Sequence, residues 1–131
     1  MTLDADLKAL ATGKNFAALT TLAADGQPRT HIMWIDSDED HLVFNTEVHR
    51  AKFRDLERDP RVTITVFNVD NPYQFVEARG TATATITGPD AKAHIDSLAS
   101  KYMGVDTYPG EIESERVIVQ MTPTKVHKNG Y

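Results

Sequence analysis

The fold is decided by residues 41–68, HLVFNTEVHRAKFRDLERDPRVTITVFN. Its apolar first part predicts a strand over residues 41–47. A short basic helix is predicted over residues 51–58, and it has to end before Pro60 because proline disfavours helical backbone at the residue before it. Residues 61–68 alternate β-branched apolar and polar side chains, which is the pattern of a half-buried strand. The segment therefore predicts two strands joined by one helix.

Four further strands are predicted on either side of this segment. Residues 15–23 and 29–36 are β-like runs separated by the turn-forming sequence DGQP, which predicts a hairpin. A long β run covers residues 73–86, and its interior Gly80 predicts a bulge or a close approach of two backbones. The last strand is expected over residues 116–126, which are rich in Val and Ile.

Two more short helices complete the predicted elements. Leucines at helical spacing predict a helix over residues 3–12, with Gly13 as its C-cap. Pro89 begins another helix, which Gly104 ends. Because most strands follow one another through tight turns, we expect one domain over residues 1–131, mainly β with short helices (α+β). Its six strands would form a largely antiparallel sheet in a closed or half-closed barrel that hides its edges.

Composition excludes several function classes. The chain has 14 Lys and Arg against 19 Asp and Glu, a net charge of −5, which gives no reason to expect nucleic-acid binding. It has no cysteine, so disulfides and thiolate nucleophiles are excluded. No stretch approaches the roughly 18 apolar residues that span a bilayer, and the first residues lack the pattern of a signal peptide. We therefore expect no membrane partner and a cytoplasmic location.

Common catalytic and metal motifs are absent from the sequence as well. It contains no glycine-rich nucleotide loop, no nucleophile elbow and no histidine spacing typical of a metal site. Four acidic residues fall in the register of an EF-hand loop: Asp36, Asp38, Asp40 and Glu47. His41 occupies the position that requires glycine, so we interpret the group as a solvated acidic turn and expect no metal.

Residues 44–52 are the best candidate for chemistry, because they pass from a strand end into a helix N-terminus that attracts anions. Arg50 and Lys52 would point in different directions if both were helical, so a shared anion requires Arg50 to be extended, just before the helix. Arginine binds a phosphate through two donors, lysine adds a point charge, and the Thr46 hydroxyl completes the cradle. The alternative is a solvated basic face that continues along the helix.

A wider pattern surrounds this candidate. Successive motifs are AALTTL (17–22), DGQP (25–28), LVFNT (42–46), RAKFRDL (50–56), DPRV (59–62) and FVEARGTA (75–82). Their order and spacing resemble the pyridoxamine 5′-phosphate oxidase-like, FMN-binding split-barrel superfamily over roughly residues 7–86. The Arg-x-Lys of the fourth motif is similar to the branch that uses the deazaflavin coenzyme F420.

This resemblance implies a Greek-key split β-barrel that forms a homodimer with two cofactor sites at its interface. The expected cofactor is F420, with FMN as the alternative. The implied cofactor-binding residues are His31, Ile32, Met33, Trp34, Asn45, Thr46, Arg50 and Lys52, together with Tyr73 and Phe75 from the other subunit. Met33 and Trp34 have core or interface packing as their alternative. His31 stands where the oxidase has a phosphate-binding arginine, so pyridoxamine phosphate oxidase activity is not expected.

The function implied is an F420-dependent oxidoreductase that transfers hydride between the reduced deazaflavin and a small unsaturated or conjugated carbonyl substrate. Two alternatives stay open: an FMN-dependent oxidase or reductase, and a non-catalytic protein that binds a flavin, F420 or haem. Arg29, Arg54 and Arg58 are candidates for a groove that holds the anionic tail of F420. No catalytic proton donor is assigned, and the loop 103–113 is expected to shape the substrate pocket.

Overall fold

The computed structural model of the chain describes residues 2–131. Its strands form one antiparallel sheet in the order β2-β1-β5-β6-β7-β4-β3. The strands are β1 (Phe16–Leu22), β2 (Pro28–Trp34), β3 (Asp36–Ser37), β4 (Leu42–Glu47), β5 (Arg61–Asn68), β6 (Asn71–Thr87) and β7 (Arg116–Asn129). The helices are α1 (Ala5–Thr12), α2 (Ala51–Arg58) and α3 (Pro89–Met103).

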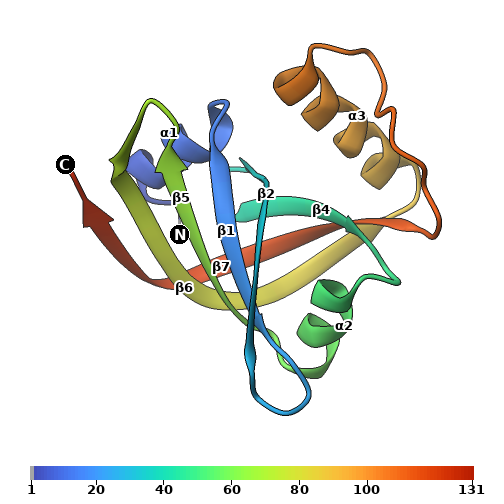
Figure 1. Cartoon of the computed structure of the whole chain (residues 1–131), viewed down its shortest axis with the longest axis horizontal. Coiled ribbons are helices and arrows are strands. Elements are labelled where there is room, and N and C mark those ends of the chain that lie inside the picture. The colour runs from blue at the N-terminus through green and yellow to red at the C-terminus, as the bar shows by residue number, and fades with distance from the viewer. Residues whose placement is uncertain (1) are drawn as a thin grey trace.

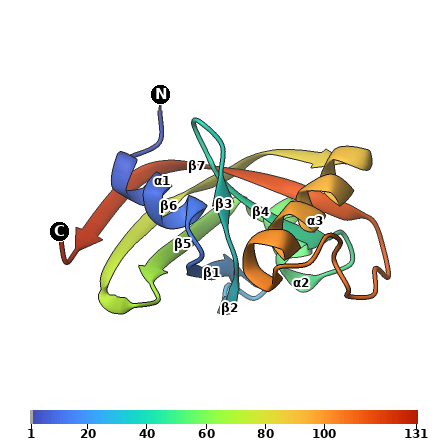
Figure 2. The ribbon, with the colours of Figure 1, turned by 90° about the horizontal axis from the view of Figure 1, so that it is seen from above.

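The sheet curls into a half-barrel, and the long strands β6 and β7 cross the whole molecule (Figure 1). Strands β5, β6 and β7 are neighbours in sequence order, and β7 returns to lie beside the earlier strand β4. The resulting order β5-β6-β7-β4 is a Greek-key arrangement. Helix α1 lies at one end of the half-barrel, while α2 and α3 lie at the other (Figures 1 and 2). The predicted mainly β, antiparallel class is therefore confirmed.

Residues 2–131 form seven strands where the sequence predicted six. The predicted run 29–36 is interrupted at Ile35, whose backbone N–H donates to the Tyr102 hydroxyl at 3.1 Å and whose carbonyl accepts from Lys101 Nζ at 2.6 Å. These bonds replace ladder bonds, so β2 pairs with β1 while the two-residue β3 pairs with β4. Side chains 66 and 67 residues further along the chain make this break, and no local pattern contains them.

The bulge expected at Gly80 is present. The pairing of β6 with β7 shifts register between Arg79 and Gly80. A Cβ atom at Gly80 would collide with the backbone carbonyl of Thr122, so only glycine lets the two strands approach this closely. The bulge lets the 17-residue strand β6 follow the curl of the sheet and pair with β7 on both sides of Gly80.

The core fills the concave side of the sheet. Asp4 caps α1 through hydrogen bonds of 3.0 Å from the Asp6 and Leu7 backbone N–H groups, so this helix begins two residues later than predicted. Leu7 of α1 packs with fully buried side chains of the strands, including Leu19, Phe44 and Ile64. No helix among residues 2–131 is long and apolar enough to cross a membrane.

Candidate functional site

A cleft of about 340 Å³ opens between β2, β4, α2, α3 and the loop that leads into β7. Its polar end is formed by side chains from the end of β4, the start of α2 and the start of β7: Asn45, Thr46, Arg50, Lys52 and Arg116. The rest of its lining is apolar and aromatic: Phe16, Ile32, Met33, Trp34, Ile95, Leu98 and Tyr108. The cleft therefore joins a cationic end to a surface suited to a flat ring.

Arg50 is the residue just before α2, and its backbone is extended, with φ −73° and ψ 147°. The sequence argument required this conformation if Arg50 and Lys52 were to serve one anion, and the structure confirms it. Arg50 lies at the N-cap without a side-chain hydrogen bond to the helix, and Lys52 follows inside the first turn. Both side chains line the cleft.

Lys52 is the unusual cation of this site. Only 9% of the residue is exposed, and among residues 2–131 no carboxylate forms an ion pair with it. Burial lowers the pKa of Lys52, and the nearby charges of Arg50 and Arg116 lower it further. A buried ammonium without a counter-charge is costly, and a bound anion would supply the missing charge.

Glu47 organises the other two cations. Its carboxylate is fully buried and accepts hydrogen bonds from the backbone N–H groups of Glu113 at 2.7 Å and Ser114 at 2.8 Å. Its second oxygen lies 3.3 Å from the Arg50 guanidinium and 3.6 Å from that of Arg116. Burial raises the pKa of Glu47, but the two backbone donors and Arg50 together bring it below its ordinary value.

This burial corrects the interpretation of Glu47 as part of a solvated acidic turn. Its side chain faces the start of β7, because Glu47 and Arg116 are partners in the β4–β7 register. Arg50 and Arg116 share this single carboxylate, and Lys52 pairs with none within residues 2–131, so the polar end of the cleft keeps an excess of positive charge. The residues present therefore fit a phosphate group, with the Thr46 hydroxyl beside it.

The aromatic wall is ordered by stacking. Trp34 lies parallel to Tyr102, with ring centroids 5.1 Å apart and an interplanar angle of 2°. Tyr108 meets Trp34 edge-on at 6.1 Å, and the Arg116 guanidinium lies over the Tyr108 ring at 5.3 Å. The backbone N–H of Tyr108 donates to Asp96 of α3 at 2.9 Å, which holds the loop against the helix. The loop thus shapes the cleft, as expected.

Seven of the ten residues proposed to bind a cofactor line this cleft: Ile32, Met33, Trp34, Asn45, Thr46, Arg50 and Lys52. His31 does not line it. Burial lowers the pKa of His31, and the charges of Lys52 and Arg29 lower it further. Tyr73 is 81% exposed on β6 and, like Phe75, lies outside the cleft of its own chain.

Sequence reasoning missed five residues of the cleft: Phe16, Ile95, Leu98, Tyr108 and Arg116. Arg116 did leave a signal, since it is the only charged residue in the otherwise uncharged run 116–124. Only the register that pairs β7 with β4 brings it to the site. Of the three arginines proposed for a tail groove, Arg29 and Arg58 pair with Asp55.

No group of three or more His, Cys, Asp or Glu residues within the described part of the chain, residues 2–131, is arranged to hold a metal ion.

The chain is thus a curled Greek-key half-barrel whose cleft has a cationic end that fits a phosphate group. Residues 3–130 match the family model described as pyridoxamine 5′-phosphate oxidase, and the chain belongs to this family. A solved structure named F420 reductase is 29% identical, with 95% of this chain and 98% of that chain covered and a TM-score of 0.83.

Two further solved structures share the fold. A conserved hypothetical protein from Mycobacterium tuberculosis is 22% identical, with a TM-score of 0.75 and coverage of 98% of this chain and 85% of that chain. A putative pyridoxamine 5′-phosphate oxidase from Listeria innocua is also 22% identical, with a TM-score of 0.67 and coverage of 91% and 90%. These two structures support the fold alone, while the family match and the likeness to the structure named F420 reductase support a flavin-related oxidoreductase fold.

Proposed function

We propose that this protein is an F420-dependent oxidoreductase that transfers hydride between the reduced deazaflavin and a small unsaturated or conjugated carbonyl compound. The observation that carries the proposal is the buried Lys52, which lacks an ion-pair partner within residues 2–131 and lies beside Arg50 and Arg116 at one end of an aromatic cleft. The likeness to a structure named F420 reductase favours the deazaflavin over FMN.

The bound cofactor would supply a hydride at one ring carbon, and the chain's own residues would place and shield it. Arg50, Lys52 and Thr46 would hold its phosphate. The aromatic side chains around Trp34 and Tyr108 would shield the ring from water. No side chain is assigned as proton donor, since solvent can protonate the product.

We further propose a cytoplasmic homodimer that completes each site. The exposed side chain of Tyr73 and its neighbour on β6, Phe75, would reach the partner's cleft, and the 63% exposed Ile32 would be covered there. Ile32 lies on β2, an edge strand of the sheet, and an exposed edge strand can pair with or be covered by another chain. Sedimentation that gives a monomer at every concentration would contradict this arrangement.

The direct test is a fluorescence titration of the protein with F420 and, separately, with FMN. Wild type should bind F420 with micromolar or tighter affinity, and the double variant Arg50→Ala/Lys52→Ala should lose that binding. The matched control is Lys125→Ala, which removes an exposed charge of β7 that does not line the cleft. Equal binding by wild type and the double variant would return Arg50 and Lys52 to the solvated basic face.

The FMN alternative shares the phosphate site and differs in what lies beyond Lys52. Tail recognition by F420 requires further cations, and Arg29 and Arg58 are committed to Asp55. If FMN binds more tightly than F420, the FMN-dependent oxidase or reductase becomes the preferred function. If a cofactor binds but no carbonyl substrate oxidises its reduced form, a carrier of flavin, F420 or haem is favoured.

A further inference from the structure

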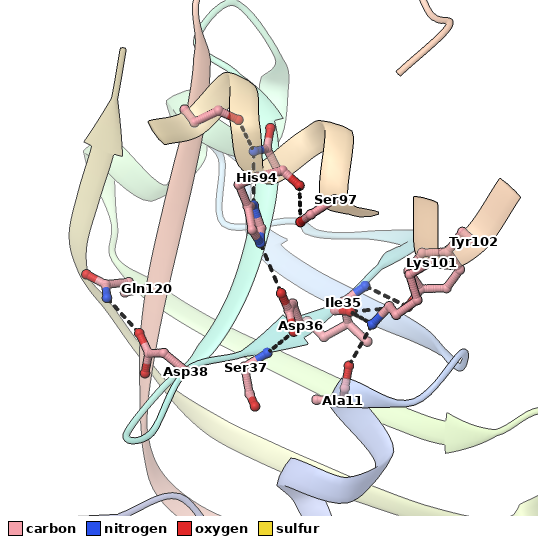
Figure 3. A network of polar contacts seen from close by, with 12 residues as sticks. Ala11, Ile35, Asp36, Ser37, Asp38, His94, Ser97, Lys101, Tyr102 and Gln120 are labelled. Carbon is pink, nitrogen blue, oxygen red and sulfur yellow. Dashed lines mark hydrogen bonds and ion pairs between the residues drawn. The ribbon is translucent and has the colours of Figure 1, made fainter. Parts of the chain in front are cut away.

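A chain of polar side chains runs from the surface of the molecule to the cationic end of the cleft. His94 points from α3 toward Asp36 of β3, and its Nε2 lies 3.2 Å from the Asp36 carboxylate (Figure 3). On the other side of the ring, His94 Nδ1 lies 3.1 Å from Asn45 Nδ2. Asn45 in turn accepts a hydrogen bond of 2.8 Å from Arg116 Nε.

The hydrogen bonds of Asn45 settle which way its amide points. Arg116 can only donate, so the atom that faces it has to be the amide oxygen. The backbone carbonyl of Ala91 can only accept, so the atom 2.9 Å from it has to be the amide nitrogen. The same nitrogen also meets His94, and both of its hydrogens are therefore donated within the protein.

The orientation of Asn45 then fixes the proton on His94. Nδ1 faces a donor and has to be the unprotonated acceptor, so Nε2 carries the hydrogen and donates it to Asp36. The His94 side chain is 13% exposed and the Arg116 side chain 7%, so little water is available to replace these bonds. The ring of His94 does not line the cleft.

Arg116 needs such support because a long side chain loses rotamer freedom when it is held in one place. Three neighbours hold it: Asn45 at Nε, the buried carboxylate of Glu47, and the face of the Tyr108 ring. Of these, Asn45 makes the shortest polar contact. An Asn45 amide that loses its acceptor on His94 can turn away, and Arg116 then loses its bond at Nε.

We propose that His94 is a positioning residue for the anion site: through Asn45 it orients Arg116 and so sets how tightly the cleft holds a phosphate group. The proposal rests on the proposed function for the identity of the ligand, but not for the orientation of Arg116. It adds a residue from α3 to a site that the sequence placed on β4 and α2 alone. Arg116 joins Arg50 and Lys52 as the third cation.

Two substitutions of His94 separate its two hydrogen bonds. Asparagine places an oxygen where Nδ1 lies, so His94→Asn keeps an acceptor for Asn45 and loses the contact with Asp36. Glutamine places its amide where Nε2 lies, so His94→Gln keeps a donor for Asp36 and loses the acceptor for Asn45. Both variants remove the ring, and each therefore controls for the packing loss in the other.

The first measurement needs no cofactor. Proton–nitrogen NMR observes the Arg116 Nε–H group, which is assigned as the signal that Arg116→Lys removes. We expect its exchange with solvent to be slow in wild type and His94→Asn and fast in His94→Gln. Inorganic phosphate, the probe for the anion site, should shift the signal in wild type and His94→Asn at roughly tenfold lower concentration than in His94→Gln.

The second measurement is F420 affinity by fluorescence, which should weaken roughly tenfold in His94→Gln and change by less than about twofold in His94→Asn. The proposal is overturned if both variants leave Arg116 Nε–H protected, or if His94→Asn loses as much phosphate affinity as His94→Gln. If wild type binds phosphate but neither F420 nor FMN, the proposed function fails, while the comparison of the two variants still decides the positioning by His94.

Discussion

Two buried carboxylates, one within α2 and one just before it, differ in how completely they neutralise the cations around them. Asp55, inside α2, is 1% exposed and accepts from the Thr21 hydroxyl at 2.8 Å and from the Arg29 and Arg58 guanidinium groups at 3.2 and 2.9 Å. Glu47, before α2, uses one oxygen for the backbone N–H groups of the loop and leaves only the other for its cations.

The comparison separates charge that stabilises the fold from charge that is available to a ligand. Around Asp55, both arginines are paired and neither side chain lines the cleft. Around Glu47, the cations outnumber the carboxylate, Lys52 has no ion-pair partner within residues 2–131, and all three cations line the cleft. Residues of the same type, a few positions apart, thus serve stability in one cluster and binding in the other.

The largest effect is expected from Asp55→Ala. The change removes the hydrogen bond to the fully buried Thr21 and leaves two arginines unpaired. We expect the free energy of unfolding in urea to fall by about 3 kcal/mol, while F420 affinity stays within about twofold because this cluster lies outside the cleft. Asp55→Asn, which can still accept from Thr21, should lose less. A stable Asp55→Ala variant that no longer binds F420 would reverse the assignment of the two clusters.

Low pH should lower the stability that each cluster provides, because it protonates Asp55 in one and Glu47 in the other. Burial raises the pKa of Asp55, but the Thr21 hydrogen bond and the two arginines bring it below 3.8, and the pKa of Glu47 likewise lies below 4.5. Because both values are depressed in the folded state, their stabilisation is complete above these ordinary values and is lost as the pH falls through the folded-state values. Urea unfolding followed from pH 7 to pH 3 should show stability that falls below about pH 4.5. The fall should be shallower in Asp55→Asn, and equal slopes would contradict the contribution of Asp55.

Glu47→Gln is expected to lower the free energy of unfolding less than Asp55→Ala does. Unlike Asp55→Ala, it should strengthen the binding of an anion. The amide oxygen still accepts from the loop, but the negative charge beside Arg50 and Arg116 is gone. We expect the free energy of unfolding to fall by about 2 kcal/mol and phosphate to bind about threefold more tightly at low salt. The gain should shrink in high salt, which screens these charges. Weaker phosphate binding at every salt concentration would show that Glu47 orients the cations more than it neutralises them.

The two clusters also show how far sequence reasoning reaches. The helix over residues 51–58, the strand over residues 61–68 and the extended Arg50 were predicted as they occur, because each rests on local pattern and backbone preference. Arg50, Lys52 and Thr46 lie within one short segment, so the phosphate candidate could be recognised without knowledge of the sheet.

The parts of the site that the sequence did not predict depend on contacts between segments far apart in the chain. Arg116 reaches Glu47 only through the register of β7 on β4, and Tyr108 reaches the cleft from a loop with no pattern of its own. Glu47 looked like an acid in a solvated turn because its partners lie about 66 residues further along the chain. The unpaired state of Lys52 is equally a property of packing, since sequence shows a charge but not its burial.

The smallest change in stability, and the sharpest contrast between the clusters, is expected from Lys52→Met. Methionine fills a similar space without a buried charge, and removal of a buried, uncompensated charge favours the folded state. We expect the free energy of unfolding of the ligand-free protein to rise by about 1 kcal/mol, while F420 affinity falls at least about tenfold. The matched control is Lys125→Met on β7, an exposed lysine that does not line the cleft. It should change stability by less than about 0.5 kcal/mol and leave binding intact.

A rise in stability together with a loss of binding is the result expected if the chain keeps Lys52 charged and buried for a ligand. If Lys52 belonged to a structural ion pair, its removal would lower stability and leave binding unchanged. That is the result expected of Asp55→Ala in the other cluster. If Lys52→Met instead destabilises the protein, then Lys52 has a partner in the free protein, and the cleft lacks the unbalanced charge on which the phosphate site rests. The pair of urea curves, with and without saturating F420, distinguishes these results, because only a protein that binds F420 gains stability from it.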